Sequence, residues 1–207
     1  MKKFIVIKGN IKHPNDANQE IITEQLKNIL SSVNNTYQKY LYSNLTYNED
    51  GSFEGILSEG QKTMQIILAI QEKMPVKLRF GVGIGPIEDG LHSSSISLAD
   101  SALKYAEEIE RRKNHFRTNI IIRCDSKILC SVFDSLSSCL YSIYTDWSKN
   151  QHAIIINMLM EDKKQKELAI MFGSSQPAIN KSIIAGSGHT FIEAISTMNK
   201  LIEKVRR

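Results

Sequence analysis

The sequence is poor in cysteine, in proline and in long apolar runs, and each shortage excludes a class of protein. Three cysteines in 207 residues form an odd set without zinc-site spacing, so we expect reduced thiols in a cytoplasmic protein. Four prolines and 42% hydrophobic residues exclude a collagen-like or disordered chain. No stretch approaches the roughly 20 apolar residues of a membrane span. The run Phe4–Ile7 is also too short for a signal peptide, so we expect no membrane partner.

An excess of charge of one sign is equally scarce, except near the C-terminus. The chain has 26 Lys and Arg against 22 Asp and Glu, a net charge of +4. Residues 147–207 hold nine basic and five acidic residues, whereas residues 1–146 are balanced. A basic segment that follows a neutral one favours a polyanionic partner for that segment, although by a small margin over an ordinary solvated surface.

Strand and helix signals alternate in the first 146 residues and predict an α+β domain. The expected strands are 4–7, a hairpin over 40–57 with its turn at 48–51, 76–87, 119–123 and 141–144, and the expected helices are 16–33, 59–73, 98–113 and 125–140. The first six elements match the split βαβ, ferredoxin-like arrangement, an antiparallel sheet with helices on one face. Everything after Asp146 is helical in pattern. We therefore predict two domains, 1–146 and 147–207.

The second domain is predicted to be a small all-α unit. Helices are expected over 148–159, 164–172 and 176–184, with Ser175 as the N-cap of the last of them. Gly173 stands at a turn position that often has positive φ. The run 165–183 resembles the helix-turn-helix of bacterial DNA-binding proteins, with an apolar core of Leu168, Phe172, Ile179 and Ile183 around the crossing at Ala169. Ser174 departs from this pattern, because its position is usually apolar.

A helix-turn-helix would bind duplex DNA through the helix that begins after Ser175. Its major-groove residues would be Ser175, Gln176, Asn180 and Lys181. Glutamine and asparagine can pair bidentately with adenine, and lysine binds guanine or phosphate. The alternative is a helical hairpin that only packs on the body. The final segment, 189–207, has apolar spacing that fits either a helix at a homodimer interface or a helix folded onto its own helix-turn-helix.

Three patterns in the first domain resemble nucleotidyl cyclase-like domains, the palm fold of diguanylate cyclases and polymerases. They are the Gly-x-Gly-x-Gly strand 78–86, the Ala-Asp-x-Ala-Leu helix 99–107 and the hairpin 50–55. With the C-terminal pattern added, the whole chain resembles the SatD family. That resemblance implies a palm-like domain followed by a helix-turn-helix. The alternate glycines 81, 83 and 85 predict close packing of a helix on that strand, with a flat ligand as the alternative.

The chain departs from the family at the positions that would bind metal. Gly9-Asn10 stands where the family has Gly-Asp, and Gly51-Ser52 replaces Asp-Glu in the hairpin. A palm cyclase holds Mg²⁺ between carboxylates, so we expect no metal, no cofactor, no catalytic residues and no enzyme activity. Asn10, Glu49 and Asp50 would mark a relic site, open to a nucleotide or small-molecule effector. The sequence thus predicts a DNA-binding transcriptional regulator; the alternative is a ligand-binding protein, or a residual cyclase-like enzyme, whose helix-turn-helix is a scaffold or interaction module.

Overall fold

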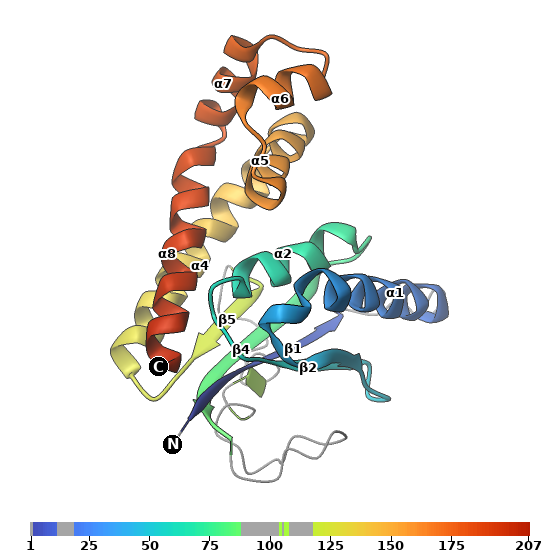
Figure 1. Cartoon of the computed structure of the whole chain (residues 1–207), viewed down its shortest axis with the longest axis vertical. Coiled ribbons are helices and arrows are strands. Elements are labelled where there is room, and N and C mark those ends of the chain that lie inside the picture. Colours follow the sequence, from blue (N-terminus) through green and yellow to red (C-terminus); the bar gives the residue numbers. More distant parts are fainter. Residues whose placement is uncertain (1, 12–18, 88–103, 105, 108–117) are drawn as a thin grey trace.

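The computed structural model describes residues 2–11, 19–87, 104, 106–107 and 118–207, and it has an α+β architecture built on one five-stranded sheet (Figure 1). The strands are β1 (Lys3–Ile11), β2 (Leu41–Tyr47), β3 (Ser52–Leu57), β4 (Leu78–Pro86) and β5 (Ile120–Arg123). The helices are α1 (Gln19–Tyr37), the 3-10 helix η2 (Gln38–Tyr40), α2 (Thr63–Lys73), α4 (Lys127–Asp146), α5 (Lys149–Glu161), α6 (Gln165–Met171), α7 (Gln176–Ala185) and α8 (Gly188–Arg206). Most of the helix expected at 98–113, including most of the 99–107 pattern, lies outside the described residues.

The sheet is mixed, which corrects the expectation of an antiparallel sheet. Its strand order is β2-β3-β1-β4-β5, and β1 pairs antiparallel with both β3 and β4. The edge strand β5 instead runs parallel to β4. Parallel neighbours need a connection of about a dozen residues or more, and 33 residues separate Pro86 from Ile120. A hairpin could not have placed β5 in this direction.

The central strand β1 is buried on both faces. Ile5 and Ile7 point into the main core, whereas Phe4 and Val6 belong to a separate apolar cluster on the other face. Because side chains alternate between the faces of a strand, a doubly covered strand has a continuous apolar run. This is why the sequence run 4–7 correctly predicted a buried strand.

Helices α1 and α2 cover the face of the sheet that carries the main core (Figure 1). On the other face, a Cβ at Gly81 would lie 1.7 Å from the carbonyl oxygen of Ala106, which is a helical residue. No side chain fits at that distance, so glycine permits the backbone of this helix to touch β4. The predicted close packing of a helix on the glycine-rich strand is therefore confirmed at Gly81.

Helix α4 continues to Asp146, so the strand expected at 141–144 is wrong. Phe133, Ser137 and Leu140 recur at helical spacing and are buried, and Tyr144 extends the same face into the main core. Packing of that face outweighs the strand preference of a short Tyr-rich segment. Within the part of the chain that the structure describes, α4 is one helix that could cross a membrane by length and composition. The sequence pattern did not indicate this helix as a membrane span, and core helices of soluble proteins can have the same length and composition.

The C-terminal helices divide between two cores. Residues of α5, α6 and α7 form a small cluster of their own, made of Ile154, Leu168, Ala169, Ile179 and Ile183. Helix α8 runs back along the sheet part (Figure 1), and Phe191, Ile195, Met198 and Ile202 join the main core. The apolar stripe of α8 is therefore buried within the chain, mostly against the sheet part. The division at residue 147 stays a prediction.

Candidate functional site

The relic site lies where β1 meets the β2–β3 hairpin. Asn10 pairs in register with Ser52 on β3 and with Arg79 on β4, so the fold places positions 10 and 52 on adjacent strands as expected. Ser52 is buried, and Glu49 and Asp50 are exposed in the turn. The Oδ1 atom of Asn10 is buried and accepts no hydrogen bond from the described residues.

The carboxylate of Asp50 is engaged by its own turn. Its Oδ1 accepts hydrogen bonds from the Ser52 hydroxyl at 2.6 Å and from the Ser52 N–H at 2.9 Å. The hydroxyl bond in particular lowers the pKa of Asp50 below its usual value. Asn48 donates its side-chain amide to the Ser52 hydroxyl at 3.3 Å. Asp50 therefore acts as an acceptor that closes the hairpin.

A buried lysine occupies the same face of the sheet. Lys8 is 8% exposed, pairs in register with Glu54 and forms an ion pair with Glu107 at 3.4 Å. Its charge also contributes to the lowered pKa of Asp50. Lys8 was not predicted from the sequence, although its even spacing from Phe4 and Val6 places it on the covered face of the strand. Among the described residues, no cluster of three or more His, Cys, Asp or Glu could hold a metal ion.

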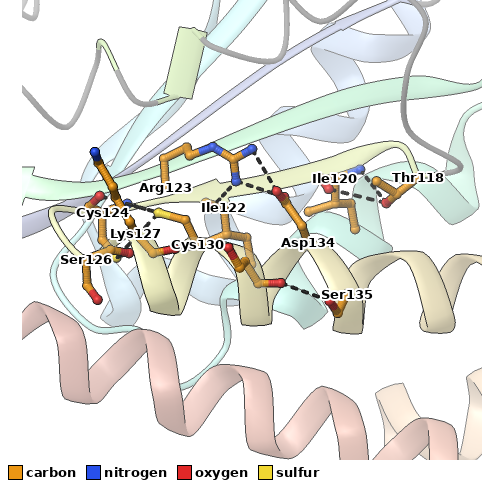
Figure 2. Close-up of polar contacts among 11 residues, drawn as sticks. Thr118, Ile120, Ile122, Arg123, Cys124, Ser126, Lys127, Cys130, Asp134 and Ser135 are labelled. Carbon is orange, nitrogen blue, oxygen red and sulfur yellow. Dashed lines mark hydrogen bonds and ion pairs between the residues drawn. The ribbon is translucent and has the colours of Figure 1, made fainter.

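A second polar site joins β5 to α4. The guanidinium of Arg123 donates to both carboxylate oxygens of Asp134, at 2.8 and 3.1 Å (Figure 2). The Arg123 side chain is 6% exposed and that of Asp134 is 19% exposed. Bidentate pairing of this kind satisfies a buried guanidinium, so this site stabilises the packing of α4 on the sheet.

Helices α6 and α7 pack against each other around the expected turn. Gly173 has φ +56°, and the Ser174 N–H donates to the Ala169 carbonyl at 2.9 Å. The hydroxyl of Ser175 accepts from the Ala178 N–H and caps α7. The Glu167 carboxylate accepts from the Lys164 N–H at 2.7 Å and caps α6. The predicted N-cap and the positive φ at Gly173 are confirmed.

The predicted DNA-binding residues differ in their availability. Ser175, Gln176 and Lys181 are exposed, and the Ser175 hydroxyl is committed to its cap. Asn180 is half-buried, and its Oδ1 accepts a hydrogen bond from the Gln165 side chain at 3.1 Å. Gln176 and Lys181 are therefore the members of the set with freely exposed functional groups.

The basic charge of residues 147–207 is spread out, and only part of it lies near α7. Four lysines (Lys163, Lys164, Lys166, Lys181) and three acidic residues fall within residues 161–185. Arg206 and Arg207 lie at the end of α8 and pair with Glu203 at 2.6 and 2.8 Å. In Figure 1 that end of α8 is remote from α7. Exposed apolar side chains at Ile170, Met171 and Ile184 accompany the lysines on this pair of helices.

Polar and aromatic contacts connect this pair of helices to the sheet part. Trp147 donates its ring N–H to the Gly186 carbonyl at 2.6 Å and packs edge-on against Phe191. Glu72 of α2 accepts from the Tyr144 hydroxyl at 2.6 Å and lies 3.2 Å from His152 of α5. The hydrogen bond with Glu72 raises the pKa of His152, and burial partly opposes it.

Helix α8 also caps the start of α2. The Glu203 carboxylate accepts from the Gly60 N–H at 2.7 Å, and Asn199 accepts from the Met64 N–H at 2.9 Å. Hydrogen bonds from Arg206 are the main reason why the pKa of Glu203 falls to about 2. Both residues are buried. In the sequence, the only sign of this contact was that Asn199 and Glu203 are polar residues among the apolar positions of one helix face.

A small cavity lies between α2, α4 and α8. Its volume is about 30 Å³, and its walls include Met64, Ile67, Tyr141 and Phe191. The Ser137 hydroxyl is buried here and has no partner among the described residues. A volume of this size holds about two water molecules. The cavity is therefore too small for a nucleotide effector.

Comparison with known proteins places the chain in a family. The sequence profile of the SatD family matches residues 4–202, so the match extends from β1 to within the last turns of α8. A search of curated proteins finds no match. The chain belongs to the SatD family.

Proposed function

We propose that this SatD-family protein is a DNA-binding transcriptional regulator with a catalytically degenerate nucleotidyl cyclase-like domain. In this proposal α6 and α7 form a helix-turn-helix. The observation that carries it is the exposed start of α7, residues 175–178, at the end of the molecule remote from the sheet (Figure 1). This position leaves the side chains of Gln176 and Lys181 accessible to a partner.

The local geometry supports the helix-turn-helix assignment. Such motifs join two helices by a three- to four-residue turn that often contains glycine. Here the turn is short, Gly173 adopts a left-handed conformation and Ser175 caps the second helix. The cluster around Ala169 fixes the two helices against each other without help from the sheet part. Helices α6 and α7 packed in this way could place α7 in the major groove of DNA without changing their relative orientation.

Gln176 is the best placed residue for base contacts. Its exposed amide offers both a donor and an acceptor, as adenine requires. The oxygen of Asn180 already accepts from Gln165, so bidentate pairing by Asn180 requires that bond to shift. Lys181 is exposed on the same helix and suits a phosphate contact. We assign base recognition mainly to Gln176, with Asn180 as a second contact.

The sheet part supports the degenerate cyclase-like assignment. The strand order β2-β3-β1-β4, with antiparallel pairing between neighbours, supports the proposed ferredoxin-like arrangement. Asn10 and Ser52 supply neutral oxygens where a palm enzyme needs carboxylates. Lys8 adds a positive charge nearby. We expect no Mg²⁺-dependent turnover of ATP or GTP; a cyclic nucleotide product that disappears in the Glu49→Ala/Asp50→Ala double variant would contradict this.

One observation favours a second candidate function, ligand binding at the relic site. The buried Oδ1 of Asn10 lacks a partner among the described residues, and an unsatisfied buried acceptor is costly. A ligand that donates a hydrogen bond would satisfy it. Thermal shifts with a nucleoside panel would test this, with Asn10→Ala expected to abolish any shift. An equal shift in both proteins would exclude Asn10 as the contact.

DNA binding itself is tested by fluorescence anisotropy with a generic duplex at low salt. Lys181→Ala should weaken DNA binding. Lys204→Ala is the matched control, because Lys204 is equally a surface lysine but lies at the far end of α8, so its loss should leave DNA binding unchanged. Selection from a random DNA pool then tests base recognition. Gln176→Ala should lower sequence preference by roughly ten-fold, in line with about 1–3 kcal/mol for a bidentate pair. Absence of binding by the unaltered protein at micromolar concentration would overturn the proposal.

A further inference from the structure

The connection between β5 and α4 brings two cysteines together. Cys124 follows the last residue of β5, and Cys130 lies in the first turns of α4, four residues after the N-cap Ser126. Their Sγ atoms are 3.9 Å apart. Figure 2 shows Cys130, in the first turn of α4, with its sulfur beside Cys124. Neither the expected DNA contacts nor the relic site uses this pair.

The two thiols are held in place by hydrogen bonds with the loop backbone. The Cys130 thiol accepts from the Cys124 N–H at 3.4 Å and donates to the Cys124 carbonyl at 3.5 Å. The Cys124 thiol donates to the Ser126 carbonyl at 3.6 Å. These contacts hold the sulfur atoms 3.9 Å apart, so the pair must approach to form the S–S bond of a disulfide.

We propose that Cys124 and Cys130 are a modification site, a dithiol that hydroperoxides convert to an intramolecular disulfide. Cys130 is half-buried and Cys124 is buried, so Cys130 meets the oxidant first. Its thiolate attacks the peroxide, the O–O bond breaks, and a sulfenic acid and water form. The Cys124 sulfur then attacks the Cys130 sulfur, the S–O bond breaks, and a second water leaves. Two thiols are oxidised and one hydrogen peroxide is reduced to two waters.

The environment of Cys124 fits the second role. Burial is the main reason why the pKa of the Cys124 thiol rises to about 11, so it is a poor first nucleophile toward a solvent oxidant. It needs only an adjacent sulfenic acid to react with. Cys139 is exposed on α4 and serves as an internal reference for a thiol without a neighbour.

The chain offers a direct test by peptide mapping. Trypsin cleaves after Arg123, Lys127 and Lys149, so Cys124 and Cys130 fall in separate peptides, 124–127 and 128–149. Because Cys139 shares the second peptide, the experiment uses the Cys139→Ser variant. After hydrogen peroxide treatment of the folded protein, alkylation should find no free thiol in place of two. The two peptides should be linked, and the intact mass should fall by two hydrogen atoms.

Two variants complete the design. Cys139→Ser/Cys130→Ser should keep its remaining thiol under the same treatment, and circular dichroism should show that every variant stays folded. In the unaltered protein, the intramolecular link should join Cys124 to Cys130 and leave Cys139 outside any intramolecular disulfide. The proposal is overturned if Cys139→Ser keeps both thiols, if it gains oxygen atoms without a link, or if disulfides form only between chains.

Discussion

The hairpin end of the sheet and the first turns of α7 use their polar residues in opposite ways. At the hairpin, Asp50 closes a turn with Ser52, and Lys8 pairs with Glu107. On α7, Gln176 and Lys181 extend into solvent from a helix whose cap is already satisfied. Most polar groups at the hairpin form hydrogen bonds or ion pairs within the chain, whereas those at the start of α7 are exposed and available to a partner.

The same contrast extends beyond these two regions. Asp134 and Glu203 serve buried donors from other elements, at β5 and at the start of α2. Removal of such a group takes a charged acceptor away from a buried donor, which is expensive. Removal of an exposed side chain on α7 leaves nothing unsatisfied. Substitutions should therefore separate into those that lower stability and those that lower binding.

The largest effect is expected for Asp134→Ala. It would leave the buried guanidinium of Arg123 without its bidentate acceptor, so we expect a loss of about 3 kcal/mol in the free energy of unfolding. Urea denaturation followed by circular dichroism measures it. Ser135→Ala is the matched control, because Ser135 is exposed and bonds only within its helix. Equal losses of unfolding free energy in both variants would show that the ion pair between Arg123 and Asp134 does not stabilise the fold.

Glu203→Ala should have the next largest effect, about 2 kcal/mol, because the Gly60 N–H and the arginines lose a charged acceptor. Lys204→Ala should be neutral by comparison. The pKa of Glu203 is lowered from 4.5 to about 2, so its contribution is present above about pH 4.5 and disappears as pH falls toward 2. Denaturation at neutral pH and at low pH measures both. A difference between variant and parent that persists unchanged below pH 2 would contradict the assignment.

Lys181→Ala should leave stability unchanged and weaken binding to all DNA sequences alike. A lost phosphate contact should reduce the slope of log affinity against log salt by about one. Anisotropy titrations at two salt concentrations measure this slope. A loss of thermal stability in this variant would contradict the contrast between the hairpin and α7, because it would show that the polar side chains of α7 also stabilise the fold.

The smallest effect is expected from pH acting on His152. The pKa of His152 is raised from 6.5 by Glu72, so its stabilising contribution is complete below about pH 6.5 and is lost as pH rises through the raised value. Partial exposure screens the pair. His152→Gln should therefore differ from the parent in melting temperature at pH 5.5 and converge with it at pH 9. If the melting temperatures of the variant and the parent differ by the same amount across this pH range, the Glu72–His152 pair does not stabilise the contact between α2 and α5.

The sequence predicted most elements, and its errors have physical causes. The hairpin turn, the run 4–7 and the caps of α7 were found because each depends on residues within a few positions. The strand expected at 141–144 failed because Tyr144 packs as the continuation of an α4 face formed by residues far earlier in the helix. The strand expected at 119–123 is present as β5, but its parallel direction was not predicted, because that direction depends on a long connection that short patterns do not describe.

The sequence by itself determined the shape of the α6–α7 turn and the exposed polar face that begins at Ser175. Those features follow from local sterics: a left-handed glycine, a hydroxyl that caps the next N–H groups, and apolar residues at helical spacing. Tertiary structure alone decided which polar groups meet. Lys8 finds Glu107 across 99 positions and Glu203 finds Gly60 across 143. Such pairs depend on how the sheet and α8 fold back, because a charge in a sequence does not specify a partner that only chain topology brings within reach.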